Sequence, residues 1–509
     1  MKSRTQKAKL NIVTALITQF ATLICGIIVP QLLIRKFGSE VYGATSSITQ
    51  FLAYISLLEG GIAGVARAAL YKPLAKNNEI EISNIVGEIK RFFKMIAFLF
   101  IIYTVILATT YNKIAHTSFD WSFTFFLVIV ISISTLAQYY FGIANSILLQ
   151  ADQKIYVNNL ISTFAIIINT VMIILFIYLD CSIITVKLVS SCVFITRPIL
   201  LSLYVKKNYR IHRPDKNVPK ALTQKYTALG QHIAYFLHSN TDIVLLTIFT
   251  NLKTVAVYSV YNMIVVYIRS VTSSFVGGME SVFGNMLANN EKDNLQKTFS
   301  NYETLISIVA TLLFSVAMVT IIPFVSIYTK SVTDTNYIQP VFSVLIILAE
   351  LTYCLRLPYH YMINAAGHFK QTKIGAYGEA LINILLSVAL VFKYGLVGVS
   401  AATLLAMIFR FIYYGIYLAK NVIYRKLSLF IKRSMINMSG VIIIFIVGNI
   451  LNGFMNVSNY FEWIILAGIV FVFAGLIIFF INWCFYRQEV RSIIDRVIGK
   501  GISKLGKKV

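Results

Sequence analysis

The sequence predicts an all-α polytopic membrane protein with about fourteen transmembrane helices, arranged as two parallel six-helix lobes followed by two C-terminal helices. Of its 509 residues, 58% are hydrophobic and only 13% are charged, whereas soluble domains carry about 25% charged residues. The mean hydropathy is +0.75, and apolar runs of about 20 residues, enough to cross a bilayer, recur along the chain. A soluble core could not cover this much apolar surface, but lipid can.

Fourteen apolar segments define the expected spans. The first follows a basic start, Met1–Lys9, and is too long and too polar for a cleaved signal, so we expect it to be retained. The expected spans are 10–33, 43–69, 92–110, 122–149, 158–180, 183–205, 226–249, 255–288, 300–328, 339–365, 374–393, 395–420, 434–452 and 461–483.

The formal charge of +25 follows the positive-inside rule, and we therefore expect no nucleic-acid partner. With the N-terminus in the cytoplasm, most of the 45 lysines and arginines fall in cytoplasmic segments, and only a few fall in the outer loops. One missing or extra span would scramble this alternation downstream. The charge pattern therefore supports fourteen spans with both termini in the cytoplasm.

A weak internal repeat suggests how the spans are grouped. The segment 150–155 after span four resembles 367–374 after span ten, and a shift of six spans keeps the orientation of each helix, as in parallel repeats. The domain prediction is an N-lobe at 1–205, a basic cytoplasmic linker at 206–225, a C-lobe at 226–420, two further spans at 434–483 and a basic amphipathic cytoplasmic tail at 484–509.

Arginines inside the spans are the main functional signal. Each would cost roughly 2.5–3.5 kcal/mol at the bilayer centre, so most should face water or protein rather than lipid. Helical spacing places several on polar faces, which we expect to line one shared aqueous cavity. Guanidinium groups bind phosphate bidentately, so such a cavity favours an anionic substrate. The predicted substrate-binding residues are Arg67, Arg269, Arg356, Arg410, Asn11, Asn262 and Gln231.

Acidic side chains in the spans leave a structural alternative open, because each could neutralise an arginine and simply join two helices. Residues four apart, such as His238 and Asp242, share a helix face and could also form a proton or cation site. The predicted coupling candidates are His238, Asp242, Glu59 and Glu280. The five cysteines show no metal-ligand spacing, and we expect no metal, no cofactor and no catalytic residue.

Four segments carry a resemblance to a known family: 11–43, 57–67, 242–261 and 394–402. Through them the chain resembles the polysaccharide transporter family, the flippases of O-antigen and capsule repeat units, within the multidrug/oligosaccharidyl-lipid/polysaccharide exporter superfamily. The resemblance implies two lobes that work by alternating access in the bacterial inner membrane. It also implies an undecaprenyl-pyrophosphate-linked glycan as substrate, with Arg67 and Arg269 where pyrophosphate would bind. Membrane lipid, a polysaccharide polymerase and assembly proteins are the expected partners.

Two alternatives belong to the same superfamily: a peptidoglycan-precursor flippase, and a cation-coupled multidrug antiporter, for which dominant acidic residues would be expected in the cavity. A membrane-embedded glycan polymerase would be expected to carry a large catalytic outer loop. The expected outer loops reach only about 11 residues, so we expect a transporter and not an enzyme. The pattern leaves open whether the membrane potential, protons or sodium drive the transport.

Overall fold

A computed structural model describes residues 4–60, 62–212, 229–276 and 278–495, and every regular element in these ranges is helical, as the sequence predicts. Packing divides the chain into two units, Met1–Ser259 and Val260–Val509, and the division falls inside helix α9 (Leu252–Ser274). The predicted lobe boundaries stay a prediction, because most of the expected linker lies outside the described residues.

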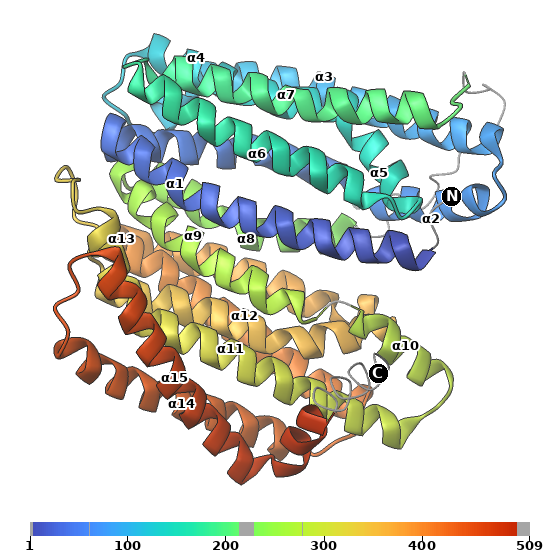
Figure 1. Cartoon of the computed structure of the whole chain (residues 1–509), viewed down its shortest axis with the longest axis vertical. Helices are drawn as coiled ribbons and strands as arrows, with labels where there is room; N and C mark the ends of the chain where they lie inside the picture. Colours follow the sequence, from blue (N-terminus) through green and yellow to red (C-terminus); the bar gives the residue numbers. More distant parts are fainter. Residues whose placement is uncertain (1–3, 61, 213–228, 277, 496–509) are drawn as a thin grey trace, which may run out of the picture. The chain divides into compact units, whose positions relative to one another are not determined.

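The first unit contains eight complete α-helices together with a short 3₁₀-helix, η1, and a π-helical turn, η2 (Figure 1). In chain order the elements are α1 (Arg4–Ala53), η1 (Tyr54–Glu59), α2 (Ile62–Ala75), α3 (Glu79–Ile114), α4 (Trp121–Ala137), η2 (Gln138–Gly142), α5 (Ile143–Ala151), α6 (Ile155–Tyr178), α7 (Ile183–Asn208), α8 (Leu229–Phe249) and the first residues of α9.

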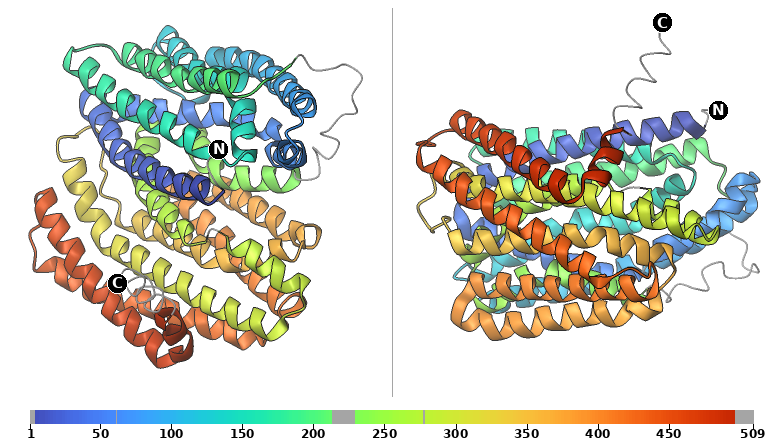
Figure 2. Two further views of the ribbon diagram at one scale, coloured as in Figure 1. Left: turned by 45° about the vertical axis from the view of Figure 1, so that its right-hand side comes forward. Right: turned by 90° about the horizontal axis from the view of Figure 1, so that it is seen from below.

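The second unit continues from α9 through six more helices. Helix α12 packs against α11 and α13, and α14 and α15 pack together on α11 (Figure 2). Val319 of α11 shares an apolar cluster with Leu466 and Val470 of α15, which fastens the last two helices to this unit. The elements are α10 (Met279–Ala288), α11 (Lys292–Tyr328), α12 (Pro340–Ala365), α13 (Phe369–Asn421), α14 (Leu427–Gly453) and α15 (Tyr460–Phe485).

The predicted spans coincide with these helices. Among the described residues, eleven helical segments are long and apolar enough to cross a membrane. One of them, 369–421, holds two of the predicted spans, 6–59 holds the first span and most of the second, and α8 adds a shorter apolar stretch at Asn240–Phe249. The predicted second span is made by the end of α1 together with η1 and α2, and the eighth by α9 and α10. The structure is therefore that of a multi-pass membrane protein.

Glycines break the two longest helices where the chain must turn back. Helices α1 and α13 contain 50 and 53 residues, which at 1.5 Å per residue would far exceed a bilayer of about 30 Å. Each is interrupted by a glycine with positive φ, Gly38 at 83° and Gly395 at 50°. Both follow a lysine and an aromatic residue, as Lys36-Phe37-Gly38 and Lys393-Tyr394-Gly395. Side chains disfavour this backbone region, so glycine permits the reversal.

Candidate functional site

The predicted site arginines of the second unit meet in one charged cluster. Arg269 comes from α9, Glu350 and Arg356 from α12, and Glu379 and Arg410 from α13. The Nη1 atom of Arg269 lies 3.1 Å from Oε1 of Glu350. Nη1 of Arg356 lies 2.7 Å from Oε1 of Glu379, and Arg410 forms an ion pair with the other oxygen of Glu379. Three helices, which hold residues of four predicted spans, therefore contribute to a single electrostatic group.

Tyr353 joins the two parts of this cluster. It lies three residues from both Glu350 and Arg356 on α12, a spacing that places all three side chains on one helix face. The guanidinium carbon of Arg269 lies 5.2 Å from the centre of the Tyr353 ring, and that of Arg356 lies 4.9 Å from it. Both distances fit cation–π contacts. The ring therefore separates two cations that would otherwise repel each other directly.

The cluster carries more positive than negative charge and is mostly buried. Three guanidinium groups share two carboxylates, and Glu379 exposes 0% of its surface. The buried Nε atoms of Arg356 and Arg410 have no hydrogen-bond partner among the described residues. Arg269 is the most accessible of the arginines, with 22% of its side chain exposed, against 6% for Arg356 and 10% for Arg410.

Arg67, the predicted site arginine of the first unit, has different surroundings. Its Nη1 atom donates to Oε1 of Gln150 at 2.8 Å, which joins α2 to α5. Among the described residues, this half-buried guanidinium forms no ion pair with a carboxylate. Glu59, a predicted coupling residue in η1, instead accepts a hydrogen bond of 2.6 Å from the hydroxyl of Tyr139. Arg67 thus keeps an unbalanced positive charge within its unit.

The polar stripe of α1 is engaged by α6. Thr14 accepts a hydrogen bond of 3.2 Å from Asn159, and Thr18 lies 2.9 Å from Thr163 between hydroxyl oxygens. The partner is 145 residues further along in both cases. This constant offset shows that α1 and α6 run parallel and in register, side by side in Figure 1. The face of α1 that carries the predicted site residue Asn11 therefore forms much of a helix contact.

Asn11 and Lys7 extend this contact to the cytoplasmic end expected for α1. The Asn11 side chain donates to the carbonyl of Gln153 at 3.0 Å and accepts from the backbone nitrogen of Tyr156 at 2.9 Å. Lys7 lies 3.0 Å from a carboxylate oxygen of Asp152. These bonds tie the start of α1 to the loop before α6. They explain why polar residues recur here without requiring that Asn11 contact a substrate.

The remaining predicted residues are separate from the cluster or lie outside the described side chains. Asp242 accepts a hydrogen bond of 3.0 Å from the hydroxyl of Tyr258 and is 7% exposed. Asn262 lies two turns from Arg269 on α9, and its half-buried amide makes no hydrogen bond within the described part of the chain. Glu280 is half-buried in the first turn of α10. The side chains of Gln231 and His238 lie outside the described residues.

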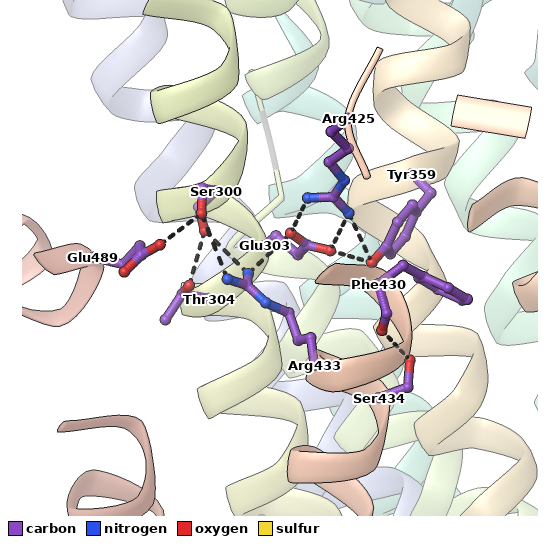
Figure 3. A network of polar contacts seen from close by, with 9 residues as sticks. All are labelled: Ser300, Glu303, Thr304, Tyr359, Arg425, Phe430, Arg433, Ser434 and Glu489. Atoms are coloured by element: carbon purple, nitrogen blue, oxygen red, sulfur yellow. Dashed lines mark hydrogen bonds and ion pairs between the residues drawn. The ribbon is translucent and has the colours of Figure 1, made fainter. Parts of the chain in front are cut away.

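Sequence reasoning missed a second group of paired charges, centred on Glu303 of α11 (Figure 3). Arg425 donates from Nη1 and Nη2 to the two oxygens of Glu303, at 2.7 and 2.8 Å. Arg433 of α14 lies 3.0 Å from Oε2, and the Tyr359 hydroxyl donates to Oε1. The predicted spans place Arg425 and Arg433 in a cytoplasmic segment, where the positive-inside rule already accounts for them. An acid in an apolar span signals that a partner is needed, but not which one.

The fold is that of polytopic membrane transporters. No family model and no curated protein matches the sequence, but solved structures match its fold. The lipid II flippase MurJ in an inward closed conformation superposes with a TM-score of 0.69 at 17% identity, covering 94% of this chain and 100% of MurJ.

Multidrug transporters have the same fold at lower similarity. The eukaryotic MATE transporter AtDTX14 gives a TM-score of 0.58 at 12% identity, over 86% of this chain and 99% of its own. An inward-facing MATE family transporter of the MOP superfamily gives 0.55 at 13% identity, over 81% and 98%. At these identities the comparisons establish the shared architecture alone.

Proposed function

We propose that the chain is a flippase that moves undecaprenyl-pyrophosphate-linked oligosaccharide repeat units from the cytoplasmic to the outer leaflet of the bacterial cell membrane, for the assembly of a surface polysaccharide. The observation that carries this proposal is the cluster of Arg269, Arg356 and Arg410, whose three positive charges share two carboxylates among the described residues. The similarity to the MurJ fold supports the same class of lipid-linked cargo.

Pyrophosphate chemistry fits the accessible part of this cluster. A pyrophosphate bridging lipid and sugar carries two negative charges and offers several acceptor oxygens, and a guanidinium fork donates to such oxygens with strong, charge-assisted hydrogen bonds. Arg269 would bind the anion, while the deeper Arg356 and Arg410 would keep the local potential positive. Arg67 would give a second cationic contact in the first unit, and the amides of Asn262 and Gln231 would contact sugar hydroxyls.

The proposed transport needs no bond to be broken in the cargo. Alternating access would carry the charged headgroup past the two lobes while the prenyl chain stays in lipid. The chain would then act as a carrier in the inner membrane, with both termini in the cytoplasm. A polysaccharide polymerase and assembly proteins would consume its product at the outer leaflet.

A peptidoglycan-precursor flippase is the second candidate, favoured by the TM-score of 0.69 with MurJ. Its cargo would also be a lipid-linked pyrophosphate, so the arginine cluster supports both candidates equally. A multidrug antiporter for cationic compounds is the third candidate, since MATE transporters share the fold. The span acids Glu303, Glu350 and Glu379 each pair with at least one arginine, whereas Glu59 and Asp242 accept hydrogen bonds from tyrosine hydroxyls.

The decisive experiment removes the charge of Arg269 together with that of its partner Glu350, so that the net charge of the cluster does not change. Arg269→Gln alone would leave Glu350 without its ion-pair partner, and breaking a buried pair costs about 3–5 kcal/mol. The double variant Arg269→Gln/Glu350→Gln avoids this cost. Surface glycan should be measured in cells that depend on this chain, at matched protein level. We expect at least a tenfold loss of export, since a charged hydrogen bond contributes about 1.5–3 kcal/mol.

Arg197 provides a matched control. It also lies in a span, donates from Nη2 to the Ser162 hydroxyl at 2.9 Å, and is outside the cluster. Arg197→Gln should retain export. Full export by the double variant would contradict the proposal. Rescue of cells that lack their lipid II flippase, without rescue of surface glycan, would favour the peptidoglycan-precursor candidate instead.

A further inference from the structure

A cavity of about 410 Å³ lies in the second unit, apart from the arginine cluster. The first turns of α11, the connection from α13 to α14, and the helical segment 487–495 after α15 surround it. Eight of the eleven residues that line it are polar or charged, among them Lys297, Asn301, Arg425, Gln488 and Glu489. The cavity can therefore receive a ligand that carries both charge and hydrogen-bonding groups.

The wall behind the cavity carries a surplus positive charge. Glu303 exposes only 2% of its side chain and is shared by Arg425 and Arg433, so two cations are balanced by one anion (Figure 3). The Nε atom of Arg425 is buried and has no hydrogen-bond partner among the described residues. Arg425 also lines the cavity itself. A buried, uncompensated charge is costly, so an anion beside Arg425 would be stabilised.

The rest of the lining offers two hydrogen-bond donors, Lys297 and Gln488, and one acceptor, Glu489. Lys297 and Gln488 are exposed, and neither forms a hydrogen bond or ion pair within the described residues. Glu489 accepts a hydrogen bond of 2.9 Å from Ser300, which leaves its second oxygen for another donor. Counting the wall, three cations and two carboxylates of the described residues surround the space: Lys297, Arg425 and Arg433, with Glu303 and Glu489. One further negative charge would make the group neutral.

The cavity lies where the apolar parts of two spans begin. Helix α11 is mostly polar up to Glu303 and mainly apolar from Ile306 onward, and the charged residues of α14, Lys432 and Arg433, both lie near its start. Beside the cavity, Leu429 and Ile431 are apolar and expose 51% and 49% of their surface. Charged side chains next to exposed apolar ones are typical of the level at which lipid headgroups meet the hydrocarbon.

We propose that this cavity binds the headgroup of a membrane phospholipid with a single negative charge: a phosphodiester that bears a hydroxylated, uncharged head. The phosphodiester contacts Lys297 and Arg425, and a head hydroxyl donates to Glu489. Because Arg425, Arg433 and the segment 487–495 enclose the cavity or its wall, the bound lipid also holds α14 to α11. This site is independent of the cargo proposed above.

The test uses the full chain in detergent and measures binding by native mass spectrometry, together with the thermal shift. The probes are phosphatidylglycerol, phosphatidylcholine, phosphatidylethanolamine and soluble glycerol 3-phosphate. Phosphatidylglycerol should bind best and raise the melting temperature. Lys297→Gln should weaken it about fivefold, because a cation near the membrane surface contributes about 1 kcal/mol to anionic-lipid binding. Glu489→Gln should reduce the preference for the hydroxylated head.

Lys292 is the matched control, since it is exposed at the start of the same helix and does not line the cavity. Lys292→Gln should bind phosphatidylglycerol like the unaltered chain. Equal binding by the Lys297→Gln and Lys292→Gln variants would overturn the site. Equal binding of the three lipids would overturn the headgroup, and a shift of the same size with glycerol 3-phosphate would show a site for free anions. None of these outcomes depends on glycan export, so this proposal and the flippase proposal fail separately.

Discussion

Glu379→Gln tests whether a single carboxylate holds the centre of the second unit together. Glu379 is fully buried and takes one arginine on each oxygen, Arg356 at 2.7 Å and Arg410 on the other side. Glutamine has nearly the same shape but no charge, and it presents an NH₂ group where one arginine needs an acceptor. One guanidinium therefore loses its partner, and two cations remain near each other in a dry site.

The expected loss is large. Removing one partner of a buried ion pair costs about 3–5 kcal/mol. For a unit of this size, 1 kcal/mol corresponds to about 2–4 °C in melting temperature, so we expect a fall of roughly 10 °C or more. The double variant Glu379→Gln/Arg410→Met should recover much of this loss, because the glutamine oxygen can accept from Arg356 and the net charge of the cluster returns to its original value.

A thiol-reactive dye can measure the melting temperature, because Cys354 is fully buried on α12 between Glu350 and Arg356. The other cysteines, which are more exposed, would first be replaced by serine: Cys25, Cys181, Cys192 and Cys484. Asp293→Asn at the exposed start of α11 is the control and should shift the melting temperature by only a few degrees. A Glu379→Gln chain that melts within about 2 °C of its parent would refute the reasoning, since the magnitude follows from buried-pair energetics.

Two further predictions concern the first unit. Although burial raises it, hydrogen bonds from Lys154, Tyr209 and Lys7 hold the pKa of the Asp152 carboxyl below its usual value. The stabilisation from the Asp152 carboxylate is therefore present above the unfolded pKa of about 4 and is lost as the pH falls through the lower folded pKa. Asp152→Asn should remove this acid-dependent part of the stability from melting curves recorded between pH 6 and pH 3. An unchanged profile would argue against the contact. Gly43→Ala should lower the melting temperature, because a Cβ there would lie 1.8 Å from the backbone oxygen of Leu252, whereas Gly64→Ala in α2 meets no atom within 4 Å and should gain up to about 1 kcal/mol.

Much of the architecture followed from the sequence because lipid imposes a strict rule. Every backbone group in the hydrocarbon must be bonded within its own helix, so length and hydropathy alone locate the spans. The kink at Gly38 falls between two predicted spans and that at Gly395 on the first residue of one, because a helix of about 50 residues cannot remain straight across one bilayer.

The site was predicted less completely, and particular residues show why. The cost of a charge in lipid indicates that Arg356 and Arg410 need protein or water around them. It does not indicate that both use Glu379, which is 23 residues from one and 31 from the other. In the same way, the polarity of Asn11 suggested a contact with substrate, but hydrogen bonds with the start of α6 and the residues before it engage its amide.

By itself, the sequence determined that this chain spans a membrane many times, where the spans lie and which side chains need special surroundings, because each of these depends on the local balance between apolar and charged groups. Only the tertiary structure decided which carboxylate neutralises which arginine, that Arg269 is the accessible one, and that Glu303 joins Arg425 to Arg433. Those pairings depend on how each helix is rotated about its axis and on which helix lies beside it. Side chains far apart in the chain set that arrangement jointly, so no single segment encodes it.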